Sequence, residues 1–358
     1  MENTNQRIEG VIAVSKARKL GFIKNPKTEQ DIAIRLDDIK HALPGDTVLV
    51  ELKNTKIDDM EQGVVVEIVK RVKTKFVGTV QKNADCFIIP DSQKVYVNFN
   101  LSDSEAAKVE HNDKVYVEID TWAENEVRPK VKVLQVIGKK GVHEVEIRSI
   151  ILEKGFDAEF AESVLRDADE LKAKWSPIPE SEIAKRRDMR GTLTMTIDPI
   201  DAKDFDDALS IKTLDNGNYE IGIHIADVAH YVTPGTIIDK EAFERQFSVY
   251  LVDRTIPMLP EVLSNDLCSL NPNEEKLAFS AIFEITKEAE VIGEWFGRTI
   301  IKSDKRFSYE NAQETLDAKS GEYFEELNTL NTISKKLAAK KFAAGAIRFS
   351  SEEFKFEL

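Results

Sequence analysis

The chain has 358 residues, of which 42% are hydrophobic, and its 50 basic and 64 acidic residues give a formal net charge of −14. This length and apolar content predict two or three domains with substantial cores, and no run approaches the ~18 apolar residues of a membrane-spanning helix. The negative charge argues against a binder of duplex nucleic acid, but a single strand can also be bound by aromatic stacking beside local basic stripes.

The N-terminal residues and the cysteines predict where the protein acts. The polar residues 1–7 are followed by no apolar stretch, so we expect no signal peptide. Cys86 and Cys268 are too few and too scattered for a disulfide framework or a zinc site. We therefore expect a soluble, cytoplasmic protein that makes no membrane contact. We also expect a monomer that uses no small-molecule cofactor.

An internal repeat covers the first 137 residues. Gly10 and Asp46 are matched by Gly78 and Asp113, at offsets of 68 and 67 positions. Segments in which apolar and polar residues alternate, separated by Pro and Gly, indicate about five short strands in each copy, which is typical of a small closed barrel. We therefore predict two tandem OB-fold barrels, at residues 1–72 and 73–137.

The first barrel carries a basic and aromatic strand. Lys19 and two further basic residues precede Phe22, and such a strand supplies phosphate contacts and a stacking face for single-stranded RNA. The segment resembles the RNA-binding strand of cold-shock domains, although Leu20 stands where an aromatic residue is frequent. Phe87 corresponds to Phe22 in the second copy but lacks the preceding basic residues. Each phenylalanine alone fits a core position equally well; the family resemblance below favours RNA contact, stronger in the first barrel.

Residues 138–190 have the pattern of a helical connector. One helix is expected over residues 144–154, ended by Gly155, and a second helix is expected after an N-cap at Asp157. Two prolines then favour an extended segment. The basic cluster that follows, residues 186–190, fits either a phosphate contact or a solvated linker.

An acidic segment lies between two predicted strands. Upstream, apolar residues alternate with threonines over residues 192–197, which predicts a half-buried strand that ends at Asp198. Downstream, residues 208–211 resume a strand. Like charges so close together repel one another, and bound cations relieve that repulsion, so we predict a metal site. Five aspartates fall in this segment: Asp198, Asp201, Asp204, Asp206 and Asp207.

The type of ligand decides which metal such a site would hold. Carboxylate oxygens are hard ligands, which favour Mg²⁺, Mn²⁺ or Ca²⁺ over Zn²⁺. No reading frame matches a Ca²⁺-binding EF-hand loop, because the fifth position counted from Asp204 is Ala208. Mg²⁺ fits best, with Mn²⁺ as the alternative, and two such ions ~4 Å apart would suit phosphodiester hydrolysis. A solvated acidic loop is the competing interpretation.

The acidic segment resembles the signature of the ribonuclease II / ribonuclease R family, whose catalytic RNB domain carries the pattern Ile-Asp-x-x-Asp-Ala-x-Asp-x-Asp-Asp-Ala. The similarity continues in order through residues 224–232, 248–251, 256–260 and 263–272. Members of the family are processive 3′-to-5′ exoribonucleases that use divalent metal and release nucleoside 5′-monophosphates. The resemblance implies a multidomain, β-rich α+β protein, in which two cold-shock-like barrels precede a partial α+β RNB domain at residues 191–358.

The resemblance also implies roles for individual acids. In the family, the residues that match Asp198, Asp204, Asp206 and Asp207 bind metal and support catalysis, whereas Asp201 is not one of this quartet. The implied mechanism is hydrolysis by a metal-activated water, with Asp206 holding or orienting that water.

Further residues are implied near the RNA. Tyr250 matches a family tyrosine that contacts the nucleotide at the 3′ end, and a buried strand tyrosine is the competing interpretation. Phe356 is the candidate for an aromatic that stacks on terminal bases. His224, Asp227 and His230 have the spacing of a zinc triad, but the family's metal ligands are aspartates, which implies a structural role near the active site.

The family pattern also sets an expectation for the end of the chain. In family members the RNB domain extends past the position that matches Leu358, supplies an arginine near the scissile phosphate, and is usually followed by an S1-type OB-fold domain. We therefore expect a chain truncated within the RNB domain. Two functions follow: a Mg²⁺-dependent processive 3′-to-5′ exoribonuclease for single-stranded RNA, or a catalytically incomplete fragment that acts only as an RNA-binding module. A hydrolase of small nucleotides would leave the barrels unexplained.

Overall fold

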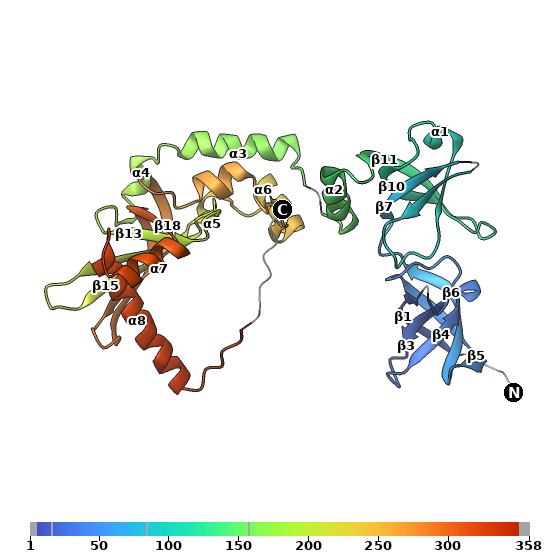
Figure 1. Ribbon diagram of the computed structural model, residues 1–358, viewed down its shortest axis with the longest axis horizontal. Helices are drawn as coiled ribbons and strands as arrows, with labels where there is room; N and C mark the ends of the chain where they lie inside the picture. The colour runs from blue at the N-terminus through green and yellow to red at the C-terminus, as the bar shows by residue number, and fades with distance from the viewer. Residues whose placement is uncertain (1–5, 16, 84, 157, 351–358) are drawn as a thin grey trace. The chain divides into compact units, whose positions relative to one another are not determined.

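The chain divides into two compact units, Met1–Ala158 and Glu159–Leu358 (Figure 1). The computed structural model describes residues 6–15, 17–83, 85–156 and 158–350. Strands make up most of the first unit, whereas the second is built on one sheet with helices beside it. Each unit has two hydrophobic clusters of its own among the described residues.

The first barrel wraps around a core of β-branched side chains that includes Ile23, Ile32 and Val50. Its sheet has the strand order β1-β5-β6-β4-β3-β2. Because only Ile12 separates β1 from β2, the two edges of the sheet belong to one bent strand, which closes the barrel. The elements are β1 (Arg7–Val11), β2 (Ala13–Ser15), β3 (Leu20–Lys24), β4 (Asp31–Arg35), η1 (Leu36–Asp38), β5 (Thr47–Ile57) and β6 (Met60–Lys70).

The second barrel is closed in the order β10-β11-β9-β8-β7 around Phe76, Phe99 and Val115. Its elements are β7 (Lys75–Lys82), β8 (Cys86–Pro90), β9 (Phe99–Leu101), α1 (Asp103–Ala106), β10 (Asp113–Thr121) and β11 (Lys130–Lys139). The prediction of two tandem OB-like barrels is thus confirmed.

The repeated aspartates perform the same task in both barrels. Asp46 and Asp113 are buried at 1% and 6% exposure. The carboxylate of Asp46 accepts a hydrogen bond from the backbone N–H of Leu43 (2.8 Å), and that of Asp113 from Glu110 (2.7 Å). Each aspartate therefore closes the turn that leads into the long strand of its barrel.

The predicted connector contains helices, but these pack on the units that flank them. Helix α2 (His143–Glu153) packs on β7, β10 and β11 of the second barrel and ends just before Gly155, whose φ is +83°. Helix α3 (Glu162–Trp175) packs in the second unit on α6 (Ile237–Arg245) and η2 (Val262–Leu267). Asp157, the expected N-cap, lies outside the described residues, and α3 follows an uncapped Ala161.

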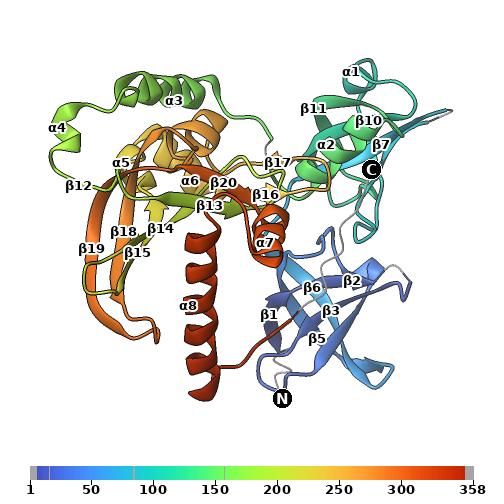
Figure 2. The same ribbon diagram turned by 60° about the vertical axis from the view of Figure 1, so that its left-hand side comes forward.

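The second unit is built on a sheet in the order β12-β19-β18-β15-β14-β13-β20 (Figure 2). The turn at 215–218, with Gly217 at φ +81°, joins β14 to β15 as predicted. The strands are β12 (Arg187–Asp188), β13 (Thr194–Asp198), β14 (Asp207–Thr213), β15 (Tyr219–Ala226), β18 (Glu275–Ile285), β19 (Val291–Lys302) and β20 (Lys305–Ser308), and a separate hairpin pairs β16 (Val249–Tyr250) with β17 (Thr255–Ile256).

Helices cover both faces of this sheet. On β18, Ala278 and Ile282 join the cluster that includes α3, whereas Ile285 joins the cluster that includes α8. The α8 residues predicted to pack, Leu327, Leu330, Ile333 and Leu337, do so. The remaining helices are α4 (Glu180–Ile183), α5 (Val228–Tyr231), α7 (Tyr309–Ala318) and α8 (Phe324–Ala343).

The strand before the acidic segment is not half-buried as predicted. Thr194, Met195 and Thr196 are all at most 1% exposed. The alternation is real, but β13 lies inside the sheet between β14 and β20, with packed side chains on both faces. The hydroxyl of Thr194 donates to the Thr192 carbonyl (2.8 Å), whereas that of Thr196 is buried without a hydrogen-bond partner in the described part of the chain.

In the part of the chain that the structure describes, no helix combines the length and apolar character needed to cross a bilayer.

Candidate active site at the aspartate loop

The acidic segment is the connection between two neighbouring strands. Strand β13 ends at Asp198, β14 begins at Asp207, and residues 199–206, which we call the aspartate loop, join them. The two strands pair antiparallel in the sheet, as Thr194 opposite Ser210 shows. The predicted position of the acids between strands is therefore confirmed. Asp198 and Asp207 stand on the rigid sheet, and Asp204 and Asp206 stand on the loop.

Arg306 holds one side of the aspartate loop. It lies on β20 opposite Thr196 of β13, two residues before Asp198. Its Nη2 donates to the carbonyl oxygens of Ile200 (2.7 Å), Pro199 (3.3 Å) and Ala202 (3.3 Å). One guanidinium nitrogen thus contacts three carbonyls of the loop, of which the Pro199 carbonyl also accepts from the Ala202 N–H (3.1 Å).

Ser269 holds the other side of the loop. Its hydroxyl accepts a hydrogen bond from the Phe205 N–H (2.9 Å) and donates to the Lys203 carbonyl (3.1 Å). The Phe205 carbonyl accepts from the Leu270 N–H (2.9 Å), and the Asp206 carbonyl accepts from the Ala226 N–H (3.0 Å). Phe205 itself is buried, so the loop is anchored in the core between its two acids.

Burial and mutual repulsion disturb the acids. Burial raises the pKa of Asp198, and the charges of Asp207 and Asp204 raise it further, whereas the nearby Thr196 hydroxyl and the Arg306 charge lower it. Partial burial raises the pKa of Asp206, and the charges of Asp204, Asp207 and Asp198 add to this effect. The four aspartates therefore share one electrostatic neighbourhood.

The acids fit a divalent cation without forming a closed cage. Among the described residues, no three His, Cys, Asp or Glu side chains converge into a metal-binding set. However, the Oδ2 atom of Asp198 is buried and has no hydrogen-bond partner within that same part of the chain. A buried carboxylate oxygen without a partner is costly, and a cation would satisfy it while relieving the repulsion. The donors are hard oxygens, which suit Mg²⁺ or Mn²⁺.

Tyr250 lies beside the loop. Its side chain is 70% exposed, so the alternative of a buried strand tyrosine is wrong. Its hydroxyl donates to Oδ2 of Asp204 over 3.4 Å, and partial burial together with the charges of Asp204 and Asp206 raises its pKa. The aromatic ring that the family pattern places near the substrate is thus next to the acids and open to solvent.

His224 is bound inside the sheet. Its Nδ1 lies 2.6 Å from Ser280 Oγ and its Nε2 lies 2.8 Å from Ser210 Oγ. Burial lowers its pKa to about 4, so the imidazole is neutral at physiological pH. Gly222 makes room for this arrangement, because a Cβ at that position would lie 2.6 Å from Nε2 of His224.

The other two residues with the spacing of a zinc triad, Asp227 and His230, also have partners of their own. Asp227 pairs with Arg186 (2.8 Å) and with Arg298 (3.5 Å). His230 packs edge-on against Trp175 with 4.3 Å between ring centroids. The three residues do not share a centre, which rules out the zinc triad and supports the structural role.

The arginines of the basic cluster 186–190 are all paired with acids. The Arg186 side chain is fully buried and pairs with Glu182 (2.9 Å) in addition to Asp227. Arg187 pairs with Glu220, and Arg190 with Asp188 and Glu275. The alternative of a solvated linker is therefore wrong, because these arginines are held by ion pairs within the second unit, whereas the alternative of a phosphate contact stays a prediction.

The two phenylalanines predicted to contact RNA, Phe22 and Phe87, lie outside the barrel cores. Phe22 alternates with the core residue Ile23, and Phe87 alternates with the core residue Ile88, so both rings are on the outer face and half-buried. Lys19 is exposed. Phe356 lies outside the described residues, and its predicted role stays a prediction.

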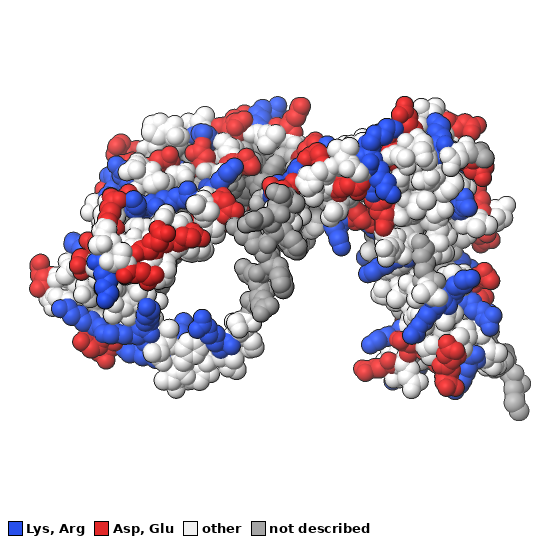
Figure 3. Space-filling view, viewed as in Figure 1, with Lys and Arg blue, Asp and Glu red and all other residues white. Residues whose placement is uncertain are grey.

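Sequence reasoning missed a basic residue in the second barrel. The guanidinium of Arg128 lies 5.3 Å from the centroid of the Phe87 ring. It comes from the segment before β11, about 40 positions after the phenylalanine, so no local pattern could reveal it. More generally, Figure 3 shows Lys and Arg interspersed with Asp and Glu over both units, without a large patch of one sign on the face shown.

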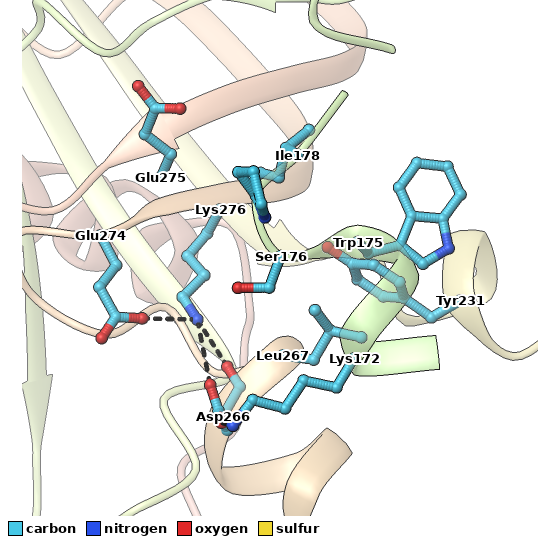
Figure 4. Close-up of a pocket in the computed structure, with 11 residues that line it drawn as sticks. Lys172, Trp175, Ser176, Ile178, Tyr231, Asp266, Leu267, Glu274, Glu275 and Lys276 are labelled. Carbon is cyan, nitrogen blue, oxygen red and sulfur yellow. Dashed lines mark hydrogen bonds and ion pairs between the residues drawn. The ribbon is translucent and has the colours of Figure 1, made fainter. Parts of the chain in front are cut away.

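A pocket of about 500 Å³ in the second unit is a less suitable site (Figure 4). Its charged groups are already paired with each other: Lys276 bonds to Glu274 (2.8 Å) and to the Asp266 carbonyl (2.6 Å). Lys172 of α3 pairs with the Asp266 carboxylate of η2. These contacts tie α3 to η2 and pair the lysines of the pocket wall with its acids.

Comparisons with known proteins agree with the motifs. A model described as the RNB domain matches residues 186–358, and one described as the cold shock domain matches residues 87–161. Ribonuclease R of Thermotoga maritima is 35% identical over 86% of this chain, which spans 43% of that protein's length. The structure of Mycoplasma genitalium RNase R in complex with ribose methylated single-stranded RNA superposes with a TM-score of 0.85 at 27% identity, covering 97% of this chain and 55% of that one.

The fold is also shared more widely. Yeast Ssd1, described as a pseudonuclease, matches with a TM-score of 0.67 at 19% identity, covering 94% of this chain and 48% of that protein. Since such a likeness concerns the fold alone, any activity has to be argued from the aspartates rather than from the architecture.

Proposed function

The chain belongs to the ribonuclease II / ribonuclease R family, and on that premise we propose that it degrades RNA as a Mg²⁺-dependent, processive 3′-to-5′ exoribonuclease. The substrate is single-stranded RNA and the products are nucleoside 5′-monophosphates. The observation that carries this proposal is the buried, unpartnered Oδ2 of Asp198 at the end of β13, in a segment that also holds Asp204, Asp206 and Asp207.

Each acid has a distinct task in this proposal. Asp198 and Asp207, fixed at the ends of two paired strands, would hold the divalent metal with Asp204, with Mn²⁺ as an alternative to Mg²⁺. When bound, the metal supplies activation of the attacking water and stabilisation of charge on the phosphate. Asp206 is exposed and adjacent to the others, and it orients the water.

The aromatic residues would bind the RNA. Tyr250 presents an exposed ring and a hydroxyl 3.4 Å from Asp204, where it contacts the nucleotide at the 3′ end. Phe22 and Phe87 stand on the outer faces of the barrels, each with a basic residue nearby in sequence or space, Lys19 and Arg128. Stacking on such rings tolerates any base, which a processive enzyme requires.

The proposed setting is RNA decay in the cytoplasm by a monomer. Both cysteines are free thiols, Cys86 partly exposed and Cys268 buried, which agrees with a reducing compartment. Sedimentation of the purified chain with and without RNA tests whether it is a monomer.

An RNA-binding module without catalysis is the second candidate. It is favoured by the open arrangement of the acids, which do not form a closed metal-binding set among the described residues. The two functions differ in their products, because a binding module retains RNA and releases nothing.

One experiment decides between them. The purified 358-residue chain is incubated with 5′-labelled single-stranded RNA and Mg²⁺, and products are separated on a gel and by chromatography. We expect the full-length band to be replaced by a short 5′-terminal remnant without a ladder of intermediates, together with nucleoside 5′-monophosphates, and we expect EDTA to abolish both. Retention of intact RNA in a gel shift, without any product at saturating Mg²⁺ or Mn²⁺, would establish the binding module instead.

A further inference from the structure

The aspartate loop is folded around one cation of the protein itself. Three of its carbonyl oxygens, those of Pro199, Ile200 and Ala202, lie within 3.3 Å of Nη2 of Arg306. The Arg306 guanidinium also lies 4.9 Å from the centroid of the Phe205 ring, so the same group contacts both ends of the loop. Carbonyl dipoles that point at one centre repel each other unless a positive charge occupies it.

Arg306 is placed for this task by the sheet. It faces Thr196 across the parallel pair of β13 and β20, and that register also sets Asp198 opposite Ser308. A displacement of the Arg306 side chain would therefore move the loop relative to Asp198, which is fixed on β13. Its Nε atom is buried and has no hydrogen-bond partner in the described part of the chain. Placing this side chain against the loop therefore costs desolvation free energy.

We propose that Arg306 is the positioning residue of the metal site: it curls the aspartate loop so that Asp204 and Asp206 face Asp198, and its charge offsets part of their repulsion. The inference deepens the proposed function and rests on it. Arg306 touches neither metal nor RNA in this scheme and acts only through the loop.

Substitution at Arg306 separates its charge from its shape. Arg306→Gln removes the charge and the planar fork. Arg306→Lys keeps a charge and a nitrogen donor, but its side chain lacks the planar guanidinium that lies 4.9 Å from the centroid of the Phe205 ring. Arg190→Gln is the matched control, because Arg190 is also paired with acids of the second unit, Asp188 and Glu275, and neither of these acids lies in the loop.

The experiment measures Mn²⁺ binding to the full chain. Binding is quantified by calorimetry and by the loss of the electron paramagnetic resonance signal of free Mn²⁺. We expect Arg306→Gln to weaken Mn²⁺ binding about 10- to 100-fold, which is typical for partners that orient metal ligands. Arg306→Lys should lie in between, and Arg190→Gln should match the unmodified chain. RNA affinity without metal should stay within about twofold in all variants, and raising Mn²⁺ should restore cleavage by Arg306→Gln.

The outcomes separate this inference from the proposed function. If the unmodified chain binds Mn²⁺ and folded Arg306→Gln binds it equally well, the positioning role is wrong while the metal site stands. If the unmodified chain binds no Mn²⁺ at millimolar concentration, the proposed function and the inference are both wrong. Should Arg306→Gln fail to fold by circular dichroism, Arg306→Lys decides, and unchanged Mn²⁺ affinity in that variant overturns the inference.

Discussion

At the residue scale, two buried polar side chains of the same sheet differ in how well their hydrogen bonds are satisfied. Asp198 buries a carboxylate oxygen without a partner, and His224 buries a neutral imidazole between two serines. The first is costly unless a ligand completes it, whereas the second is fully satisfied. Acid chemistry and structural support are therefore carried by different polar residues of the same sheet.

Asp206 should be essential for cleavage and dispensable for RNA binding. Asp206→Asn keeps the shape but removes a charge that orients water, so we expect cleavage to fall at least about 100-fold, equivalent to about 2.7 kcal/mol. Gel-shift affinity for single-stranded RNA should remain near that of the unmodified chain. Asp201→Asn is the control, because Asp201 is exposed and outside the quartet, and it should cleave normally. Equal cleavage by Asp206→Asn would remove Asp206 from the mechanism.

His224 should make the second unit sensitive to acid. Burial lowers its pKa from 6.5 to about 4, so between these values the unfolded chain binds a proton that the folded chain does not. The free energy of unfolding should therefore fall as pH drops from 6.5, by about 3 kcal/mol at pH 4. Denaturant titrations at several pH values measure this loss.

A variant isolates the contribution of that imidazole. His224→Gln should be less stable at pH 7, because it disturbs two buried hydrogen bonds, but should lose less stability on acidification. His111→Gln, in the first unit, should retain the full pH dependence. An identical slope in His224→Gln and the unmodified chain would mean that other groups cause the acid sensitivity.

At the element scale, strands were easier to predict than the contacts between them. Alternation of apolar and polar residues located the barrels and β13, since a strand's two faces are read directly from neighbouring positions. The half-buried prediction for β13 was wrong because burial of its threonine face depends on helices and strands far along the chain.

In the candidate site, too, local patterns were predicted and contacts between distant segments were not. The aspartates are adjacent in sequence and were predicted from it, as was Tyr250 by resemblance. Arg306 lies 100 positions after Asp206 and reaches the loop only because β20 pairs with β13. Arg128 reaches Phe87 only through closure of the second barrel. Long-range pairing of this kind leaves no local pattern to read.

The outer face of the second barrel should bind RNA in spite of its poor local sequence. Removal of a stacking ring costs about 1–3 kcal/mol, so Phe87→Ala should weaken binding of single-stranded RNA about 5- to 150-fold, and Arg128→Gln should weaken it less. Fluorescence anisotropy with a labelled oligonucleotide measures this. Val69→Ala, at a residue 46% exposed on β6, is the control and should bind normally. Unchanged affinity in Phe87→Ala would assign that ring a packing role only.

At the scale of the whole molecule, two units with separate cores predict separate responses to metal. The aspartates all lie in Glu159–Leu358, so a bound ion stabilises only that unit. At a concentration 100 times its dissociation constant, Mn²⁺ should raise the free energy of unfolding of that unit by about 2.7 kcal/mol. Hydrogen exchange measured by mass spectrometry should become slower in the second unit when Mn²⁺ is added and should stay unchanged in the barrels. A shift in the barrels alone would place the cation elsewhere.

One glycine limits which sequences can adopt this sheet. Gly222 has no side chain where Ser210 and His224 meet, and even a methyl group there would displace the imidazole. Gly217, in contrast, stands at a turn with open space around it, and its restriction comes only from its φ of +81°. In a saturation library, position 222 should therefore reject every replacement by crowding, whereas position 217 should accept asparagine, which tolerates the left-handed backbone.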